Sequence, residues 1–421
     1  MIVLSGAELV LPDRILSPGT LVIDAGRIAD IRQGASPSPT LPFYGHYIVP
    51  GFIDVHVHGI EGVDALEAGS VAVMAARLPP FGVTAFCPTT VACAPDALRR
   101  MLEEVRRARE SPADRAARVL PAHLESNFIS PAFAGAQPTH CLRSARGALD
   151  IWAGGAGGAG GAGRVGRARG AGGAGGEFDG AEILREIDRA VPDVGIVTVA
   201  PEIDGGLDLV AWLVSRGVRV SLGHSGATFE VAMAAIAAGA MHATHLYNRM
   251  SPADHRAPGL AGAVLQADDV AAELICDGLH VHPAVIRTTV AAKRPSRIMA
   301  ITDGTAATGL PAGARARLGD HTITVGDAAY LDDGTLAGSV LTMDRAFELL
   351  VRRVGLSPVD AATMCATTPA RELGLVGHGV IAVDAVADLV VLDSQFSVVQ
   401  TYVGGRLVYA RRSNGLPLST V

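Results

Sequence analysis

The sequence predicts an α/β protein in which a TIM-type (β/α)8 barrel is joined to a small β-sandwich domain built from both termini. Three observations predict this fold. The chain has 421 residues, 49% of them hydrophobic, which is enough for a full-size barrel and an accessory domain. Both chain ends are rich in β-type runs. Between them, apolar runs alternate with alanine-rich stretches, as in parallel βα repeats.

The predicted accessory domain combines residues 1–49 with residues 377–421. Short apolar runs alternate there with Gly and Pro turn signals, as in IVLSGAELVL near the N-terminus and VIAVDAVADLVVLD near the C-terminus. This pattern is typical of antiparallel β-strands joined by turns. Because the two segments flank the predicted barrel, residues 50–376, we expect both ends to assemble into one domain.

Eight apolar runs are the predicted barrel strands, and most precede an alanine-rich helical stretch. They occupy residues 52–59, 83–90, 119–126, 195–202, 218–225, 241–248, 272–280 and 298–305. The carboxyl ends of barrel strands meet at one mouth, so polar residues at these ends converge. The residues at or just past the ends of the runs are His56, His58, Glu125, His224, His245, His280 and Asp303. Histidines buried for packing alone would not gather at one end of so many strands.

A glycine-rich segment, residues 147–180, interrupts the pattern between the third and fourth runs. It is mostly Gly, Ala and Arg, with few large side chains to bury, and we expect a flexible insertion or surface loop. Gly155, Gly157 and Gly160 match the spelling GxGxxG, but no apolar strand leads into them. We therefore predict no dinucleotide site and disfavour a Rossmann-type dehydrogenase.

The charged residues exclude several function classes. Lys293 is the only lysine, and it precedes the eighth run at the end opposite the predicted mouth. Schiff-base, P-loop and lysine-carbamate chemistry are therefore disfavoured. The net charge is −7 and no basic stripe is interleaved with aromatics, so we expect no nucleic-acid partner.

The cysteines and the N-terminus predict a cytoplasmic protein. An odd number of scattered cysteines without a CxxC spacing fits reduced, buried thiols: Cys87, Cys93, Cys141, Cys276 and Cys365. The first residues lack a basic region followed by an apolar one, and no apolar run is long enough to cross a bilayer. We expect no membrane partner.

The polar residues at the strand ends predict a metal centre. His56 and His58 project from the same face of one strand, because side chains alternate with period two. Together with Glu125, His224 and His245 they offer enough ligands for one or two divalent ions. Zinc is our first expectation, with iron, manganese and cobalt as alternatives. Since Lys293 is remote, Glu125 would have to bridge two ions.

Asp303, at the end of the eighth run, is the predicted general base and acid. A divalent ion lowers the pKa of a bound water from about 15.7 to about 7, so no amine or thiol nucleophile is needed. The predicted reaction class is hydrolysis.

Several motifs resemble those of the N-acetylglucosamine-6-phosphate deacetylases of the amidohydrolase superfamily. In chain order they are VPGFIDVHVHG, HLESNFISP, LGHSGAT, ATHLYNRM, PGLAGA, DGLHV, ITDGTAATG and GTLAGSVLTM. The resemblance runs from about residue 50 to about residue 375. The combination of ATHLYN, DGLHV and TDG is more specific than HxH alone.

The resemblance implies a metal-dependent enzyme that releases acetate from N-acetylglucosamine 6-phosphate. It implies that Glu125, His224 and His245 hold the main ion and that Asp303 activates the water. His56 and His58 match the members of the family that hold a second ion.

The resemblance also implies substrate contacts. His280 would polarise the acetamide carbonyl, while Asn248 and Arg256 would hold the sugar phosphate. In the family the matching arginine crosses a dimer interface, so a homodimer is implied.

Two departures from the family pattern concern the sugar. Ser126 and Asn127 replace the usual Gly-Pro, and Gln137 stands where a substrate-contacting histidine is usual. Glutamine still donates a hydrogen bond but carries no charge. The alternatives are therefore deacetylation of another N-acetyl amino sugar, such as N-acetylgalactosamine 6-phosphate or an unphosphorylated sugar, or a catalytically silent scaffold.

Overall fold

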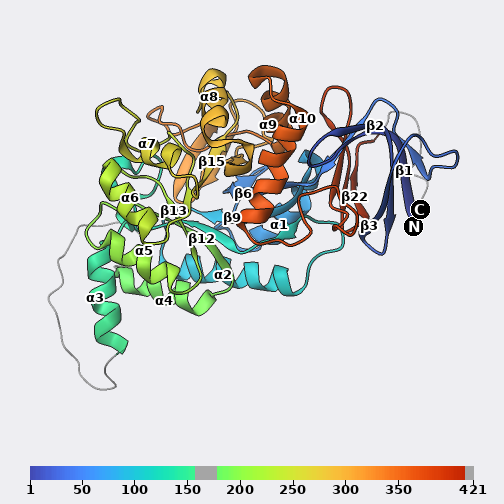
Figure 1. The fold of residues 1–421 in the computed structure, drawn as a ribbon. Coiled ribbons are helices and arrows are strands. Elements are labelled where there is room, and N and C mark those ends of the chain that lie inside the picture. The colour runs from blue at the N-terminus through green and yellow to red at the C-terminus, as the bar shows by residue number, and fades with distance from the viewer. Residues whose placement is uncertain (157–177, 413–421) are drawn as a thin grey trace.

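The computed structural model describes residues 1–156 and 178–412 and contains a parallel barrel surrounded by helices (Figure 1). Each predicted run overlaps one barrel strand. In order of pairing these are β6 (Phe52–Val57), β9 (Val83–Thr90), β11 (Ala122–Glu125), β12 (Val194–Val199), β13 (Arg219–Leu222), β14 (His242–Ala243), β15 (Ala271–Ile275) and β16 (Ile298–Ile301).

The barrel nearly closes between its first and last strands. Just past β16, the backbone N–H of Asp303 donates to the carbonyl of His56 at 3.0 Å, and Val57 forms a parallel bridge with Gly304. The predicted TIM-type architecture is confirmed, and its closure brings the strand ends of β6 and β16 together.

Helices follow the barrel strands and cover them from outside (Figure 1). The helix α2 shows why: proline occupies its first turn, and Leu98, Met101, Leu102 and Val105 place one buried stripe against the core. The helices are α1 (Ser70–Arg77), α2 (Pro95–Glu110), α3 (Ala145–Ala156), α4 (Gly180–Ala190), α5 (Gly206–Val214), α6 (Phe229–Ala237), α7 (Gly259–Gln266), α8 (Pro283–Lys293), α9 (Met343–Leu349), α10 (Pro358–Ala362) and α11 (Thr368–Glu372).

The two chain ends build one mostly antiparallel sheet beside the barrel (Figure 1). Its strands are β1 (Ile2–Val10), β2 (Ile15–Asp24), β3 (Arg27–Gln33), β4 (Leu41–Pro42), β5 (Tyr47–Pro50), β20 (Leu389–Leu392), β21 (Val398–Val403) and β22 (Arg406–Ala410). Antiparallel pairing of β5 with β20 joins the N-terminal and C-terminal strands. The purely antiparallel arrangement predicted for residues 1–49 is wrong, because β4 and β5 pair with β1 in parallel.

This sheet has its own apolar core, which includes Leu4, Leu21, Ile48 and Leu389. We propose on this basis that residues 1–49 and 377–421 form a composite domain, with residues 50–376 as the barrel domain.

Several short strands were not predicted. They are β7 (Gly59–Ile60), β8 (Val63–Asp64), β10 (Arg118–Val119), β17 (Arg315–Leu318), β18 (His321–Val325) and β19 (Ala329–Tyr330). The last three form a separate antiparallel sheet between β16 and α9, with a small core that includes Leu318 and Ile323.

The prediction of a loop over residues 147–180 is wrong for its first residues, because α3 continues to Ala156. Leu149 and Trp152 pack against the barrel core, and alanine favours helix, so this part has both a face to bury and a suitable composition. Residues 157–177, including Gly157 and Gly160, lie outside the described residues.

Other predictions about single residues are confirmed. All five cysteines are free and buried, and burial raises the pKa of the Cys141 thiol to about 11. Lys293 ends α8, and its Nζ donates to the carbonyl of Ala267 at 2.5 Å, away from the strand ends that form the mouth.

Among the described helices, none has the length and apolar character needed to cross a membrane.

Candidate metal centre

Six of the predicted side chains meet at the carboxyl ends of the barrel strands. His56 lies on β6 and His58 just past it, and Glu125 is the last residue of β11. The other three, His224, His245 and Asp303, each come two residues past the end of a strand, namely β13, β14 and β16. All six are at most 7% exposed, so the cluster forms a largely water-excluded site.

Three of these residues have a strained backbone. His224, His245 and Asp303 have φ values of 47°, 30° and 49°, in the left-handed region that non-glycine residues rarely adopt. Such strain costs on the order of 1–3 kcal/mol per residue and is typical of functional sites. The turn after each strand directs the side chain into the cluster.

Glu125 lies between two pairs of histidines. Its Oε1 is 2.9 Å from Nε2 of His224 and 2.8 Å from Nε2 of His245, and these two nitrogens are 3.1 Å apart. Its Oε2 is 3.4 Å from Nε2 of His58. One carboxylate therefore faces both pairs.

The second histidine pair faces Asp303. The Nε2 atoms of His56 and His58 are 3.1 Å apart, and Oδ1 of Asp303 lies 3.4 Å from the first and 3.3 Å from the second. Asp303 is thus within reach of the position that these imidazoles share.

The donor set fits a divalent metal. Ligands held about 2.1 Å from one ion in tetrahedral geometry are about 3.4 Å apart, close to the spacing within each group. Two groups, His56 with His58 and Glu125, and Glu125 with His224 and His245, meet this requirement.

The electrostatics of the cluster also favour a cation. Burial alone lowers the pKa of His58, but the facing Asp303 and Glu125 outweigh it and raise this pKa to about 10. His245 behaves in the same way, and its pKa is raised to about 9, mainly by Glu125. Burial favours the neutral form of Glu125, but His224 and His245 hold its pKa well below its ordinary value. Protons therefore occupy nitrogens that a metal would use.

Two predicted substrate residues follow barrel strands at the same end as the cluster. His280 follows β15, and its Nδ1 is 2.6 Å from Oδ2 of Asp277, with the side chain 5% exposed. The amide of Asn248 is half-buried and donates to the backbone carbonyls of His245 and Leu246 at 3.3 and 3.4 Å. Both roles stay predictions.

Gln137 and Arg256 are placed differently. Gln137 is buried, its amide nitrogen donates to Oε2 of Glu125, and its oxygen accepts from the backbone N–H of Ala92 at 2.7 Å. Arg256 lies exposed in the loop before α7, and its guanidinium has no ion pair among residues 1–156 and 178–412. The structure does not bring Arg256 into the cluster.

The departures at Ser126 and Asn127 have a structural role. The Ser126 hydroxyl donates to the carbonyl of Thr198 at 2.6 Å. The Asn127 amide donates to the carbonyls of Cys93 and Cys141, both at 2.8 Å. Both side chains are buried, and these hydrogen bonds hold the loop after β11.

The sequence did not single out two buried residues below the cluster. Glu273 in β15 lies 2.9 Å from Nδ1 of His56, and His123 in β11 lies two residues before Glu125 on the same strand face. Burial raises the pKa of Glu273 and lowers that of His123 to about 4. A signal was available, since Glu273 is a charged residue inside an otherwise apolar strand.

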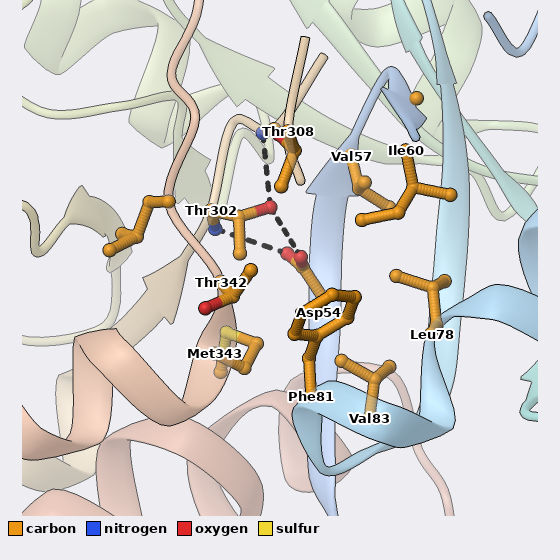
Figure 2. Close-up of a pocket in the computed structure, with 13 residues that line it drawn as sticks. Asp54, Val57, Ile60, Leu78, Phe81, Val83, Thr302, Thr308, Thr342 and Met343 are labelled. Atoms are coloured by element: carbon orange, nitrogen blue, oxygen red, sulfur yellow. Dashed lines mark hydrogen bonds between the residues drawn. The ribbon is translucent and has the colours of Figure 1, made fainter. Parts of the chain in front are cut away.

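Asp54 was also missed, and it joins the strands on either side of the barrel closure. Figure 2 shows its carboxylate against Thr302, whose hydroxyl donates to Asp54 at 2.5 Å. The backbone N–H groups of His56 and Thr302 donate to the same carboxylate at 3.2 and 3.3 Å. The adjoining pocket is lined mainly by apolar side chains and by none of the six cluster residues, so we assign no substrate to it.

Comparisons with known proteins agree with the fold and the site. The sequence model described as the amidohydrolase family matches residues 47–408. The N-acetylglucosamine-6-phosphate deacetylase of Bacillus subtilis is 31% identical, with 95% of each chain covered. The enzyme of the same name from Rattus norvegicus is 34% identical, covering 96% of this chain and 91% of its own.

A solved structure is similar over nearly the whole chain. It is a mutant N-acetyl-D-glucosamine-6-phosphate deacetylase from Mycobacterium smegmatis in complex with N-acetyl-D-glucosamine-6-phosphate. Its TM-score is 0.81 at 32% identity, with 97% of this chain and 99% of that chain covered.

Proposed function

The chain belongs to the amidohydrolase family and, within it, to the N-acetylglucosamine-6-phosphate deacetylases, and on this basis we propose that it hydrolyses the acetamide of N-acetylglucosamine 6-phosphate. The products are acetate and glucosamine 6-phosphate. The observation that carries the proposal is the convergence of four histidines on Glu125 and Asp303 at the mouth of the barrel.

The ligands divide into two groups that share Glu125. His224, His245 and Glu125 would hold one divalent ion, and His56 with His58 would hold a second, with Glu125 between the two. Bound metal supplies Lewis acidity and makes water a better nucleophile at neutral pH. Zinc is the first expectation, since imidazole and carboxylate ligands at this spacing suit it, and iron, manganese and cobalt use the same ligands.

Asp303 is the group that moves the proton. Burial favours its neutral form, but His56 and His58 outweigh this and lower its pKa, so the carboxylate is ionised at neutral pH. In that form it accepts a proton from the water that adds to the acetyl carbon, and it returns the proton to the sugar nitrogen as the C–N bond breaks.

His280 is the second catalytic residue in this proposal. Asp277 contacts its Nδ1, so Nε2 is the ring nitrogen that would contact the substrate. A donor at Nε2 requires the doubly protonated ring, with Nδ1–H donating to Asp277, and in that form His280 would stabilise the charge that develops on the acetyl oxygen.

The sugar and its phosphate are assigned to residues of the surrounding loops. Gln137 would contact the sugar, while Asn248 and Arg256 would hold the sugar phosphate, since a guanidinium offers paired donors at fixed charge. The exposure of Arg256 suits an arginine that completes a site in a second copy of the chain, so a homodimer belongs to the proposal. A cytoplasmic location also belongs to the proposal, because the five cysteines are free.

A panel of N-acetyl sugars tests the substrate. Acetate release should be fastest with N-acetylglucosamine 6-phosphate and much slower with N-acetylgalactosamine 6-phosphate and with N-acetylglucosamine. Equal rates with and without phosphate would overturn the role of Arg256, and a faster galacto isomer would replace the proposed sugar.

A further inference from the structure

The two ring nitrogens of His56 face different partners. Its Nε2 faces the cluster formed with His58, Glu125 and Asp303, while its Nδ1 lies 2.9 Å from Oε2 of Glu273, directly below. Both side chains are fully buried. The orientation of this imidazole is therefore set by a single carboxylate from another strand.

The group of His56, His123 and Glu273 has the spacing of a third metal site, but its hydrogen bonds argue against one. Nδ1 of His123 lies 3.0 Å from the backbone carbonyl of Val55. A carbonyl only accepts, so this nitrogen carries hydrogen and has no lone pair for an ion. Nε2 of His123 is engaged with the hydroxyl of Thr198 at 2.9 Å.

The same layer of the barrel interior is a chain of polar contacts. The hydroxyl of Thr198 lies 2.8 Å from that of Thr244, which in turn lies 2.7 Å from that of Ser221. Barrel interiors are mostly filled by apolar side chains, so a polar layer under the strand ends needs an explanation. Within this layer, the Glu273 carboxylate contacts a cluster imidazole, at Nδ1 of His56.

We propose that Glu273 is a positioning residue that accepts the Nδ1 hydrogen of His56 and thereby presents the Nε2 lone pair to the metal held by His56 and His58. Carboxylates commonly orient metal-binding histidines in this way, and their loss weakens metal binding by about 10–100-fold. Glu273 also accepts from the backbone N–H of His245 at 3.4 Å, and its own carbonyl accepts from Leu246 at 2.8 Å. It therefore fixes the backbone of one histidine and the ring of another.

This inference rests on the proposed metal-dependent function, so the experiment measures metal and catalysis separately. The full-length wild type, the Glu273→Gln variant and a Ser221→Ala control are loaded with zinc, and the zinc content is followed as a chelator is added. Ser221 belongs to the same polar layer but does not touch His56. We expect two ions in the wild type and in the control, with one ion bound 10–100-fold more weakly in Glu273→Gln.

Two results would overturn the proposal: a Glu273→Gln variant that holds both ions with wild-type affinity, or a wild type that never holds a second ion. Failure of the proposed function is distinguishable, because it appears as zinc-loaded wild type that releases no acetate from any N-acetyl sugar.

A measurement on the unmodified chain covers the case in which Glu273→Gln fails to fold. Nitrogen-15 NMR of the histidine rings in metal-free protein should show His56 with hydrogen on Nδ1 and a bare Nε2. Hydrogen on Nε2 instead would contradict the role of Glu273.

Discussion

Glu125 is the residue on which the whole site converges. Its two oxygens face different histidine pairs, and its partners come from β6, from the turns after β13 and β14, and from Gln137. A carboxylate in this position would lie between two ions without a lysine carbamate. The chain has a single lysine, and that lysine is buried at the other end of the barrel.

The role of Asp303 predicts the effect of one substitution. Asp303→Asn keeps the size of the side chain but removes the group that accepts and returns the proton, so acetate release should fall by about 10²–10⁴-fold. Metal content should stay at the wild-type level, because His56, His58, Glu125, His224 and His245 remain. Asp269→Asn is a matched control, since Asp269 is 99% exposed. Full activity in Asp303→Asn would remove it from the mechanism.

The raised pKa values predict proton release when metal binds. With pKa values of about 10 and about 9, His58 and His245 hold protons at pH 7 in metal-free protein. Metal needs the same lone pairs, so binding must expel these protons, and the apparent affinity should rise with pH until about pH 9–10. Calorimetry in two buffers of different ionisation heat measures the number released. Zinc uptake at pH 7 without proton release would show that the cluster is already deprotonated.

The site residues at the ends of strands could be predicted from the sequence. The buried residues inside strands, which contact them or their backbone from below, could not. HxH, HLE and the single histidines after later runs stand at recognisable positions, because the end of an apolar run is visible in a sequence. Glu273, His123 and Asp54 lie within strands, where a polar residue has several structural explanations. Their partners are on other strands, and only the closed barrel brings them into contact.

Among the elements, the turn after β16 shows how a distant loop holds a catalytic side chain. The backbone N–H of Ser339 donates to the carbonyl of Asp303 at 2.8 Å, and the Ser339 hydroxyl donates to the carbonyl of Thr302 at 2.5 Å. Gly338 has φ +66° and lies against the same turn. These contacts join the sequence motif GTLAGSVLTM, which contains Gly338 and Ser339, to the motif ITDGT, which contains Asp303.

A pair of glycine substitutions tests this contact. In Gly338→Ala the new Cβ would lie 2.8 Å from the carbonyl oxygen of Asp303, so we expect a loss of activity of at least tenfold as Asp303 shifts. Gly334→Ala is the matched control, because Gly334 has a similar φ of +83° with nothing within 4 Å of its Cβ. Both variants carry the same kind of backbone strain. Equal activities, measured by acetate release, would show that the loop does not position Asp303.

Most elements could be predicted, but their lengths and some additions could not. All eight barrel strands coincide with predicted runs, although β12 and β15 begin one residue before theirs and β14 contains only His242–Ala243. The sheet of β17 to β19 lies between β16 and α9, where a βα repeat would have only a turn, so nothing in the repeat pattern predicts it. The start of the glycine-rich segment is helical because Trp152 packs edge to face with Trp212, at 5.3 Å between ring centroids, a contact between segments far apart in sequence.

On the scale of the whole molecule, Asp388 joins the terminal sheet to the barrel. It precedes β20 and is 3.2 Å from the guanidinium of Arg118 in β10, which pairs with barrel strand β9. It also accepts from Nδ1 of His378 at 2.8 Å and from the backbone N–H of Gly404 at 2.6 Å. The carboxylate is buried, and its removal would take one acceptor from all three partners.

Removing this carboxylate should destabilise the protein without changing its chemistry. We expect Asp388→Ala to lower the free energy of unfolding by about 2–3 kcal/mol, because a partly buried arginine and a histidine lose their partner. Asp332→Ala breaks an exposed pair with Arg315 and should cost less than about 1 kcal/mol. Urea unfolding measures both. Equal stabilities would mean that Asp388 contributes nothing to the joint between the sheet and the barrel.

The measurement that tests the central claim most directly is acetate release from N-acetylglucosamine 6-phosphate before and after removal of metal. The site described here requires that activity disappear when a chelator strips the protein and return when divalent metal is added back, up to two ions per chain. Activity that survives complete metal removal, or metal-loaded protein that releases no acetate, would contradict it.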